Sequence, residues 1–131
     1  MCIFCKIIAG ETPSYKVYED EKTLAFLDIK PVNPGHVLVL PKQHYQNLEE
    51  INDVDLKALI FVVKKVGALL KDKLKVIGYN VGINNDPVAG QIIPHLHIHV
   101  IPRRENDGLV EWPRQDYISG EAEEILKKLT D

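Results

Sequence analysis

The sequence has few of the features that mark membrane, secreted or nucleic-acid-binding proteins. Its 131 residues contain no apolar run long enough to span a membrane, and the segment Met1 to Lys6 lacks the basic and apolar stretches of a secretion signal. The net charge of -3 gives no electrostatic basis for binding a nucleic-acid backbone, although a local site could still bind a small anion. We therefore predict a cytoplasmic protein with no membrane segment and no nucleic-acid partner.

The length and the hydrophobic fraction of 45% predict one globular domain with its own core. Alternating and helical periodicities indicate antiparallel hairpins, one long helix and a final helix, which together predict an α+β domain with an antiparallel sheet. Gly67 lies inside the long helix, where it indicates a close packing contact. The expected elements are a helical turn at 4–9, strands at 15–18, 23–27, 36–40 and 78–83, a long helix from 52 to 74 and a helix at 121–129.

Residues 95–100 combine histidine with strict alternation, which is the period of a strand. Three imidazoles are therefore expected on one face and three aliphatic side chains on the other. The outer two imidazoles would start about 13 Å apart, which disfavours a three-histidine metal cup. Grouping three polar, titratable side chains on one strand face is costly unless they are hydrogen-bonded, so the pattern indicates either a hydrogen-bond network or a function. The histidines are His95, His97 and His99, and the aliphatic residues are Leu96, Ile98 and Val100.

The pattern His-x-His-x-His followed by two hydrophobic residues, here 95–101, resembles the signature of the histidine triad (HIT) family. Segments 26–29, 34–44 and 84–91 are also similar to family segments, in family order. Together they cover most of residues 2–104, which leaves 105–131 as a C-terminal tail and helix of a single HIT domain, 1–131. The resemblance implies a five-stranded antiparallel sheet with two main helices, and a homodimer formed through the long helix and a sheet edge.

The resemblance also assigns roles to three histidines. A neutral imidazole with a pKa near 6.5 can attack phosphorus at cytoplasmic pH. His97 matches the nucleophile that attacks the α-phosphorus of a nucleotide and forms a covalent nucleotidyl-histidine. His99 matches a residue that hydrogen-bonds a phosphate oxygen or assists the leaving group, and His36 matches a fourth histidine packed against the triad.

Other matched positions imply a nucleotide site. Asp28 corresponds to the carboxylate that holds the ribose hydroxyls, and Asn84 and Gln91 correspond to polar residues near the phosphates, while Phe26 and Ile29 correspond to apolar contacts around base and sugar. Structural alternatives stay open from the residues alone: a core position for Phe26, a turn cap for Asp28 and a strand end for Asn84. Ile92 departs from the family, which often has Ser or Thr there, so a hydroxyl contact to the phosphate or leaving group is missing.

The two cysteines, Cys2 and Cys5, could form a disulfide, a redox pair or half of a metal site. A reducing compartment disfavours the disulfide, and no strand precedes Cys2 as it would in a thioredoxin-like motif. The resemblance implies one structural zinc per chain, held by Cys2, Cys5, His44 and His95. The alternative is a pair of free cysteines beside an exposed histidine.

The function implied is a nucleotide hydrolase or transferase that acts on purine nucleotide conjugates of the AMP type, such as adenosine phosphoramidates. Hydrolysis of dinucleoside polyphosphates is the alternative within the same chemistry, and Arg103 and Arg104 would matter for it. A nucleotide-binding interaction module with little turnover is the alternative from another class, which Ile92 makes more plausible. Zinc catalysis on the histidine strand is disfavoured by the strand geometry.

Overall fold

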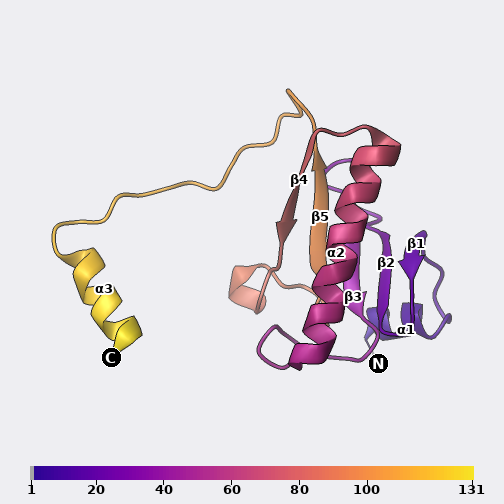
Figure 1. The fold of residues 1–131 in the computed structure, drawn as a ribbon, viewed down its shortest axis with the longest axis horizontal. Coiled ribbons are helices and arrows are strands. Elements are labelled where there is room, and N and C mark those ends of the chain that lie inside the picture. The colour runs from indigo at the N-terminus through magenta and orange to yellow at the C-terminus, as the bar shows by residue number, and fades with distance from the viewer. Residues whose placement is uncertain (1) are drawn as a thin grey trace.

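The computed structural model describes residues 2–131 and shows a five-stranded antiparallel sheet with strand order β1-β2-β3-β5-β4 (Figure 1). All four strand pairings are antiparallel, so the predicted α+β class and sheet are confirmed. The elements are α1 (Ile3–Ile8), β1 (Lys16–Glu19), β2 (Thr23–Leu27), β3 (Val37–Pro41), α2 (Asp53–Leu74), β4 (Gly78–Gly82), the 3-10 turn η1 (Pro87–Ala89), β5 (Ile98–Arg103) and α3 (Glu121–Thr130).

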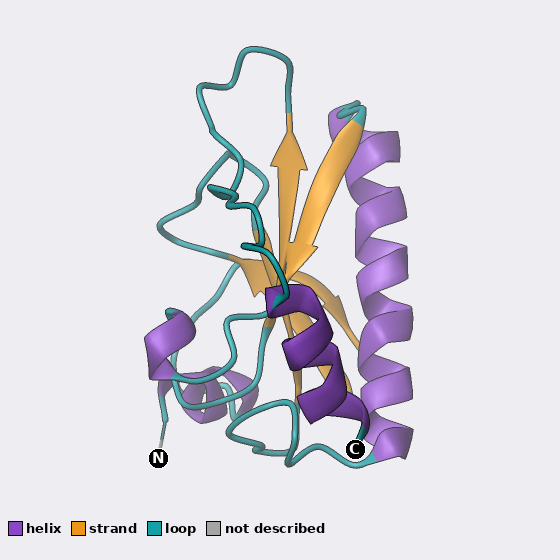
Figure 2. Ribbon diagram, turned by 90° about the vertical axis from the view of Figure 1, so that its left-hand side faces the viewer, coloured by secondary structure: helices purple, strands orange, loops and turns teal. Residues whose placement is uncertain are grey.

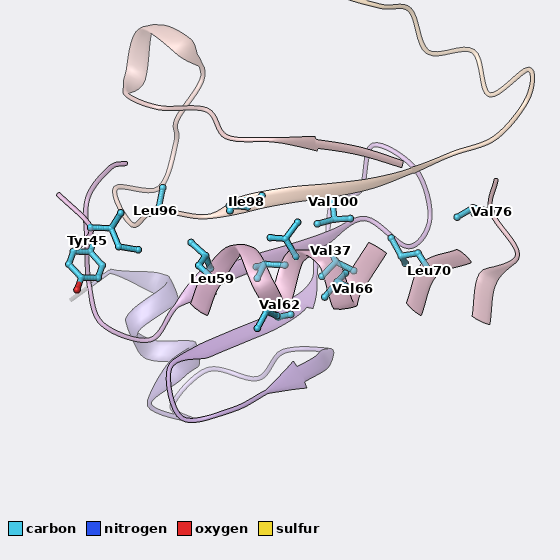
Figure 3. Packing of buried hydrophobic residues seen from close by; sticks show 14 residues of the cluster. Val37, Tyr45, Leu59, Val62, Val66, Leu70, Val76, Leu96, Ile98 and Val100 are labelled. Atoms are coloured by element: carbon cyan, nitrogen blue, oxygen red, sulfur yellow. The ribbon is translucent and has the colours of Figure 1, made fainter. Parts of the chain in front are cut away.

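The two faces of the sheet are covered by different helices. The long α2 lies along one face, and the short α1 lies on the opposite side (Figure 2). The larger core lies between the sheet and α2, where Ile98 and Val100 of β5 pack with Leu59 and Val66 (Figure 3). The smaller core, on the α1 side, consists of Phe4, Leu24, Phe26, Leu38 and Leu40.

The alternation of residues 95–100 is confirmed, because Leu96, Ile98 and Val100 all belong to the α2-side core. The regular strand, however, begins at Ile98 rather than at His95. The reason lies in the backbone hydrogen bonds: Leu96 N–H donates to the carbonyl of Tyr45, in a loop, at 2.7 Å instead of to a neighbouring strand. His95 therefore ends a bend, with its N–H bonded to the Ile93 carbonyl at 2.8 Å, and His97 lies in the irregular segment just before β5.

The long helix begins and ends where local chemistry favours it. The Asn52 side chain caps the N-terminus by accepting the Asp55 N–H at 2.8 Å, and Lys75 ends the helix in a left-handed conformation. The predicted close contact at Gly67 is with Tyr79 of β4, because a Cβ at position 67 would overlap the Tyr79 ring.

Gly67→Ala should therefore destabilise the protein by about 1 to 3 kcal/mol, although Ala is the better helix former. The added methyl group has no space unless Tyr79 moves. Urea denaturation measures the loss. In a Tyr79→Ala background the same substitution should be neutral or stabilising, and a loss that persists there would show that the Tyr79 ring is not the cause.

The C-terminal segment leaves the sheet after β5 and crosses open space before α3 (Figure 1). Its start is fixed by Asp107, whose carboxylate accepts hydrogen bonds from the Arg103 guanidinium at 2.8 and 3.1 Å and from Asn33 at 3.1 Å. No residue of α3 is buried. Within residues 2–131, no helix is both long and apolar enough to cross a bilayer.

Candidate functional site

His97 is held in one tautomer by the backbone beside it. Its Nδ1 lies 2.7 Å from the carbonyl oxygen of His95, and because a carbonyl can only accept, Nδ1 must carry the proton. The other nitrogen, Nε2, then has a free lone pair and makes no hydrogen bond within residues 2–131. The ring of Phe4 from α1 packs edge-on against the His97 imidazole, with centroids 5.0 Å apart. The structure thus presents a neutral, oriented imidazole with a lone pair on Nε2.

A second chain of hydrogen bonds sets the tautomer of His99. The Val32 backbone N–H donates to His36 Nδ1 at 3.1 Å, so in the neutral ring the proton of His36 is on Nε2. His36 Nε2 lies 2.9 Å from His99 Nδ1 and donates to it. His99 must then carry its own proton on Nε2, a buried atom that has no partner among the described residues. An unpartnered buried N–H is costly and points to a ligand acceptor.

Burial keeps these imidazoles neutral. Desolvation lowers the pKa values of His36, His97 and His99 below the usual 6.5, and the pKa of His99 falls to about 4 because His97 and His36 also repel a charge there. The nearby Asp28 carboxylate raises all three pKa values and so offsets part of this effect. At neutral pH, both hydrogen-bond chains therefore keep the tautomers described above.

Two cavities meet at these histidines. One, of about 590 Å³, is mainly apolar, and His97 and His99 line it. The other, of about 660 Å³, lies between His36, His99 and the tail segment 109–112. Both are lined by Asp28, Lys30, Asn84 and His99, so one ligand can extend from the first cavity past His99 into the second. The apolar walls of the first are Ile3, Phe4, Ile7, Phe26, Leu27, Ile29, Leu38, Ile92 and Ile93.

Most of the residues predicted to bind a nucleotide line these cavities. Phe26 is buried and Ile29 is exposed, and both line the apolar cavity. Asp28 accepts the Lys30 N–H at 2.9 Å through Oδ1, so it also closes a local turn, while Oδ2 lies 3.8 Å from His36 Nε2. Ile92 lines the apolar cavity with 87% of its surface exposed, so replacing it would leave no void in the core.

Gln91 lines neither cavity. Its Oε1 accepts the Asp86 N–H at 2.8 Å, and its Nε2 donates to the carbonyls of Gln46 and Ile93 at 2.7 and 3.0 Å. The amide thus ties the 84–91 loop to a neighbouring segment. This structural role was not predicted from the sequence, and neither was the contribution of α1 residues to the apolar cavity. The spacing of Ile3, Phe4 and Ile7 on one helical face was the available signal for the latter.

A separate cluster brings together Cys2, Cys5, His44 and His95, as predicted. The His44 and His95 Nδ1 atoms lie 3.2 Å apart, the two Sγ atoms 3.2 Å apart, and the four sulfur-to-nitrogen distances are 3.3 to 3.7 Å. An ideal tetrahedral zinc site has edges of about 3.3 Å for N–N, 3.6 Å for S–N and 3.8 Å for S–S. The cluster therefore has the size and shape of a closed four-ligand metal site, although the distance between the two Sγ atoms is shorter than the ideal S–S edge.

The orientation of His95 also suits metal binding. Its Nε2 lies 2.9 Å from the Pro41 carbonyl and donates to it, which leaves the lone pair on Nδ1, inside the cluster. Burial raises the pKa of Cys5, as does the neighbouring Cys2 thiol, so without a cation the Cys5 thiol is held neutral. Two soft sulfurs and two imidazoles are the donor set that zinc prefers.

Comparison with known proteins agrees with the fold. The HIT domain family model matches residues 9–106. The chain is 56% identical over 130 residues to an uncharacterized HIT-like protein of Methanocaldococcus jannaschii, with 98% of each chain covered. It is 42% identical over 134 residues to adenosine 5'-monophosphoramidase HNT1 of Saccharomyces cerevisiae, with 98% of this chain and 82% of that protein covered.

Solved structures give the same result. A HIT family protein of Bacillus subtilis superposes with a TM-score of 0.89 at 42% identity, covering 98% of this chain and 94% of the other. A zinc-bound histidine triad protein of Mycobacterium smegmatis superposes with a TM-score of 0.80 at 34% identity, covering 97% and 91%. With the family model matching residues 9–106 and a relative more than half identical along nearly its whole length, this chain belongs to the HIT domain family.

Proposed function

We propose that the protein is a nucleotide hydrolase that cleaves adenosine phosphoramidates, or related nucleotidyl conjugates, at the α-phosphate and releases AMP. The observation that carries the proposal is the fixed tautomer of His97, whose unprotonated Nε2 stands beside an apolar cavity. The similarity to three fungal proteins named adenosine 5'-monophosphoramidase supports it.

The proposed reaction has two steps. His97 Nε2 attacks the α-phosphorus, a nitrogen–phosphorus bond forms, and the bond from phosphorus to the leaving amine breaks. Water then attacks the same phosphorus, and the bond to His97 Nε2 breaks, which releases AMP and restores the imidazole. The proton that this water loses to solvent balances the proton that the departing amine takes up from solvent. His97 Nδ1 keeps its proton, and the His95 carbonyl stabilises the positive charge that develops on the ring. His99 Nε2–H, which lacks a partner in the described structure, donates to a phosphate oxygen or to the leaving group.

Comparing substrates tests the proposal. The purified protein should turn over adenosine 5'-phosphoramidate with a higher kcat/KM than a dinucleoside polyphosphate. The structure gives no support to the alternative substrate, because the Arg103 guanidinium already bonds Asp107 and Asn80, and Arg104 donates to the Pro34 carbonyl. AMP binding without turnover of either substrate would instead identify a binding module.

We predict that Asp28→Ala weakens AMP binding by roughly 1.5 to 3 kcal/mol, because a carboxylate bonded to two ribose hydroxyls makes charge-assisted contacts. Calorimetry with AMP and with a 2',3'-modified analogue measures the effect. The analogue cannot form these bonds, so its affinity should change much less. Equal losses for both ligands would show that Asp28 acts only through the turn at Lys30.

The pH profile of kcat/KM should have its acid limb below pH 6.5. His36 must be neutral to accept the Val32 N–H, and His99 must be neutral to accept from His36; burial lowers both pKa values, that of His99 to about 4. Protonation breaks these hydrogen bonds, so activity is present above the lowered pKa values and is lost as the pH falls through them. A decline centred at or above pH 6.5 would contradict this assignment.

We also propose that Cys2, Cys5, His44 and His95 hold one structural zinc per chain, where its four protein ligands leave no open position for catalysis. The zinc-bound mycobacterial neighbour supports this choice of metal. A homodimer remains a further prediction, and exposed apolar residues of α2 and of the segment around β4, including Phe61 and Ile77, offer a surface for it. The cytoplasmic location likewise remains a prediction.

A further inference from the structure

The short helix α1 belongs to two sites at once. Its Cys5, together with the N-cap residue Cys2, contributes the two sulfurs of the metal cluster. Its Ile3, Phe4 and Ile7 form part of the wall of the apolar cavity that His97 lines. The two sites therefore share one six-residue element.

The attachment of α1 to the rest of the protein is narrow. Within the described chain, every hydrogen bond that joins residues 2–14 to residues beyond Tyr15 runs through the sulfurs of Cys2 or Cys5. The other backbone bonds of this segment stay inside it, as in Ala9 N–H to the Cys5 carbonyl. The remaining attachment is the buried side chain of Phe4, with its smaller apolar neighbours. A six-residue helix is far below the length at which helices persist alone.

Phe4 connects the cluster to the catalytic histidine. Its ring lies edge-on to His95, to His97 and to Phe26, with centroid distances of 6.0, 5.0 and 5.6 Å. A displacement of α1 would therefore remove the ring that packs on His97 and, at the same time, open the apolar cavity.

We infer that metal occupancy of the cluster controls nucleotide affinity by holding α1 in place as one wall of the base site. Metal binding and nucleotide binding then strengthen each other through the same helix, and by linkage each raises the affinity of the other by the same factor. This inference rests on the proposed nucleotide and zinc sites. It adds that the zinc, which has no part in the chemistry, acts on recognition of the base.

The test compares two ligands on zinc-loaded full-length protein and on protein freed of zinc by a chelator under reducing conditions. Titration calorimetry should show AMP binding about 5- to 150-fold more weakly to the zinc-free protein, the usual range for coupled sites. Ribose 5-phosphate, which has no base to contact α1, should bind both forms equally. Equal AMP affinities would overturn the inference and leave the proposed function standing. No AMP binding to the zinc-loaded protein would overturn both.

Zinc-free protein could lose its fold, so a second measurement uses only loaded protein. Competition with a zinc-binding dye should show that AMP raises zinc affinity by the factor found above, while ribose 5-phosphate does not. Ile7→Ala, which keeps all four ligands, should weaken AMP binding and reduce this linkage. Lys6→Ala, on the exposed side of the same helix, should change neither. Zinc affinity unaffected by AMP would overturn the inference.

Discussion

His97→Ala should abolish turnover, with kcat lowered by roughly a thousandfold or more, because no other group in the described site has an oriented, unprotonated nitrogen for attack on phosphorus. AMP binding and zinc content should stay largely intact, since His97 is not a member of the metal cluster and the predicted ribose contact is Asp28. Steady-state kinetics, calorimetry and elemental analysis measure the three quantities on the same preparation.

A direct test exists for the proposed covalent step. A phosphoramidate bond to histidine is labile in acid, so the reaction should be stopped with alkali. Mass spectrometry should then find a nucleotidyl group on the peptide that contains His97. A label on His99, or wild-type turnover by His97→Ala, would show that this mechanism is wrong.

The second large effect concerns the metal cluster. Cys5→Ser should lower zinc from about one per chain to a small fraction, because a hydroxyl is a poor ligand where a thiolate is required. Without the zinc, the three remaining ligand side chains lie close together with no metal ion to bind their lone pairs. We expect a loss of several kcal/mol, which for a domain of this size lowers Tm by roughly 10 °C or more.

The matched control is Lys6→Ser, one residue along the same helix but exposed and outside the cluster. It should keep both the zinc content and the Tm of the wild type. Wild-type protein from metal-replete medium that contains no zinc would rule out the assignment, as would a Cys5→Ser variant with unchanged zinc content.

The parts of this fold that follow from local pattern could be predicted from the sequence. Alternation in 95–100 identified the buried and polar faces correctly, although the regular strand starts at Ile98, because a loop carbonyl and not a strand receives the Leu96 N–H. Helical periodicity identified α2. Gly67 signalled a close contact.

Contacts between residues that are far apart in the sequence could not be predicted from local sequence patterns. Nothing near Gly67 in the sequence identifies Tyr79 as its neighbour. Cys2 and Cys5 supply only half of a metal site, and His44 and His95 lie about 40 and 90 residues away, so the family resemblance was needed to name them. The tautomer of His99 depends on the backbone of Val32, through His36, which only coordinates reveal.

The amide of Gln91 has a kinetic consequence. Its three hydrogen bonds, with the Leu48 N–H to Asn85 bond, hold the 84–91 loop in shape before any nucleotide arrives. A loop that is already ordered loses little entropy when a ligand binds. Nucleotide association should then be a single step whose observed rate rises linearly with concentration, without the plateau that a slow closing motion would impose.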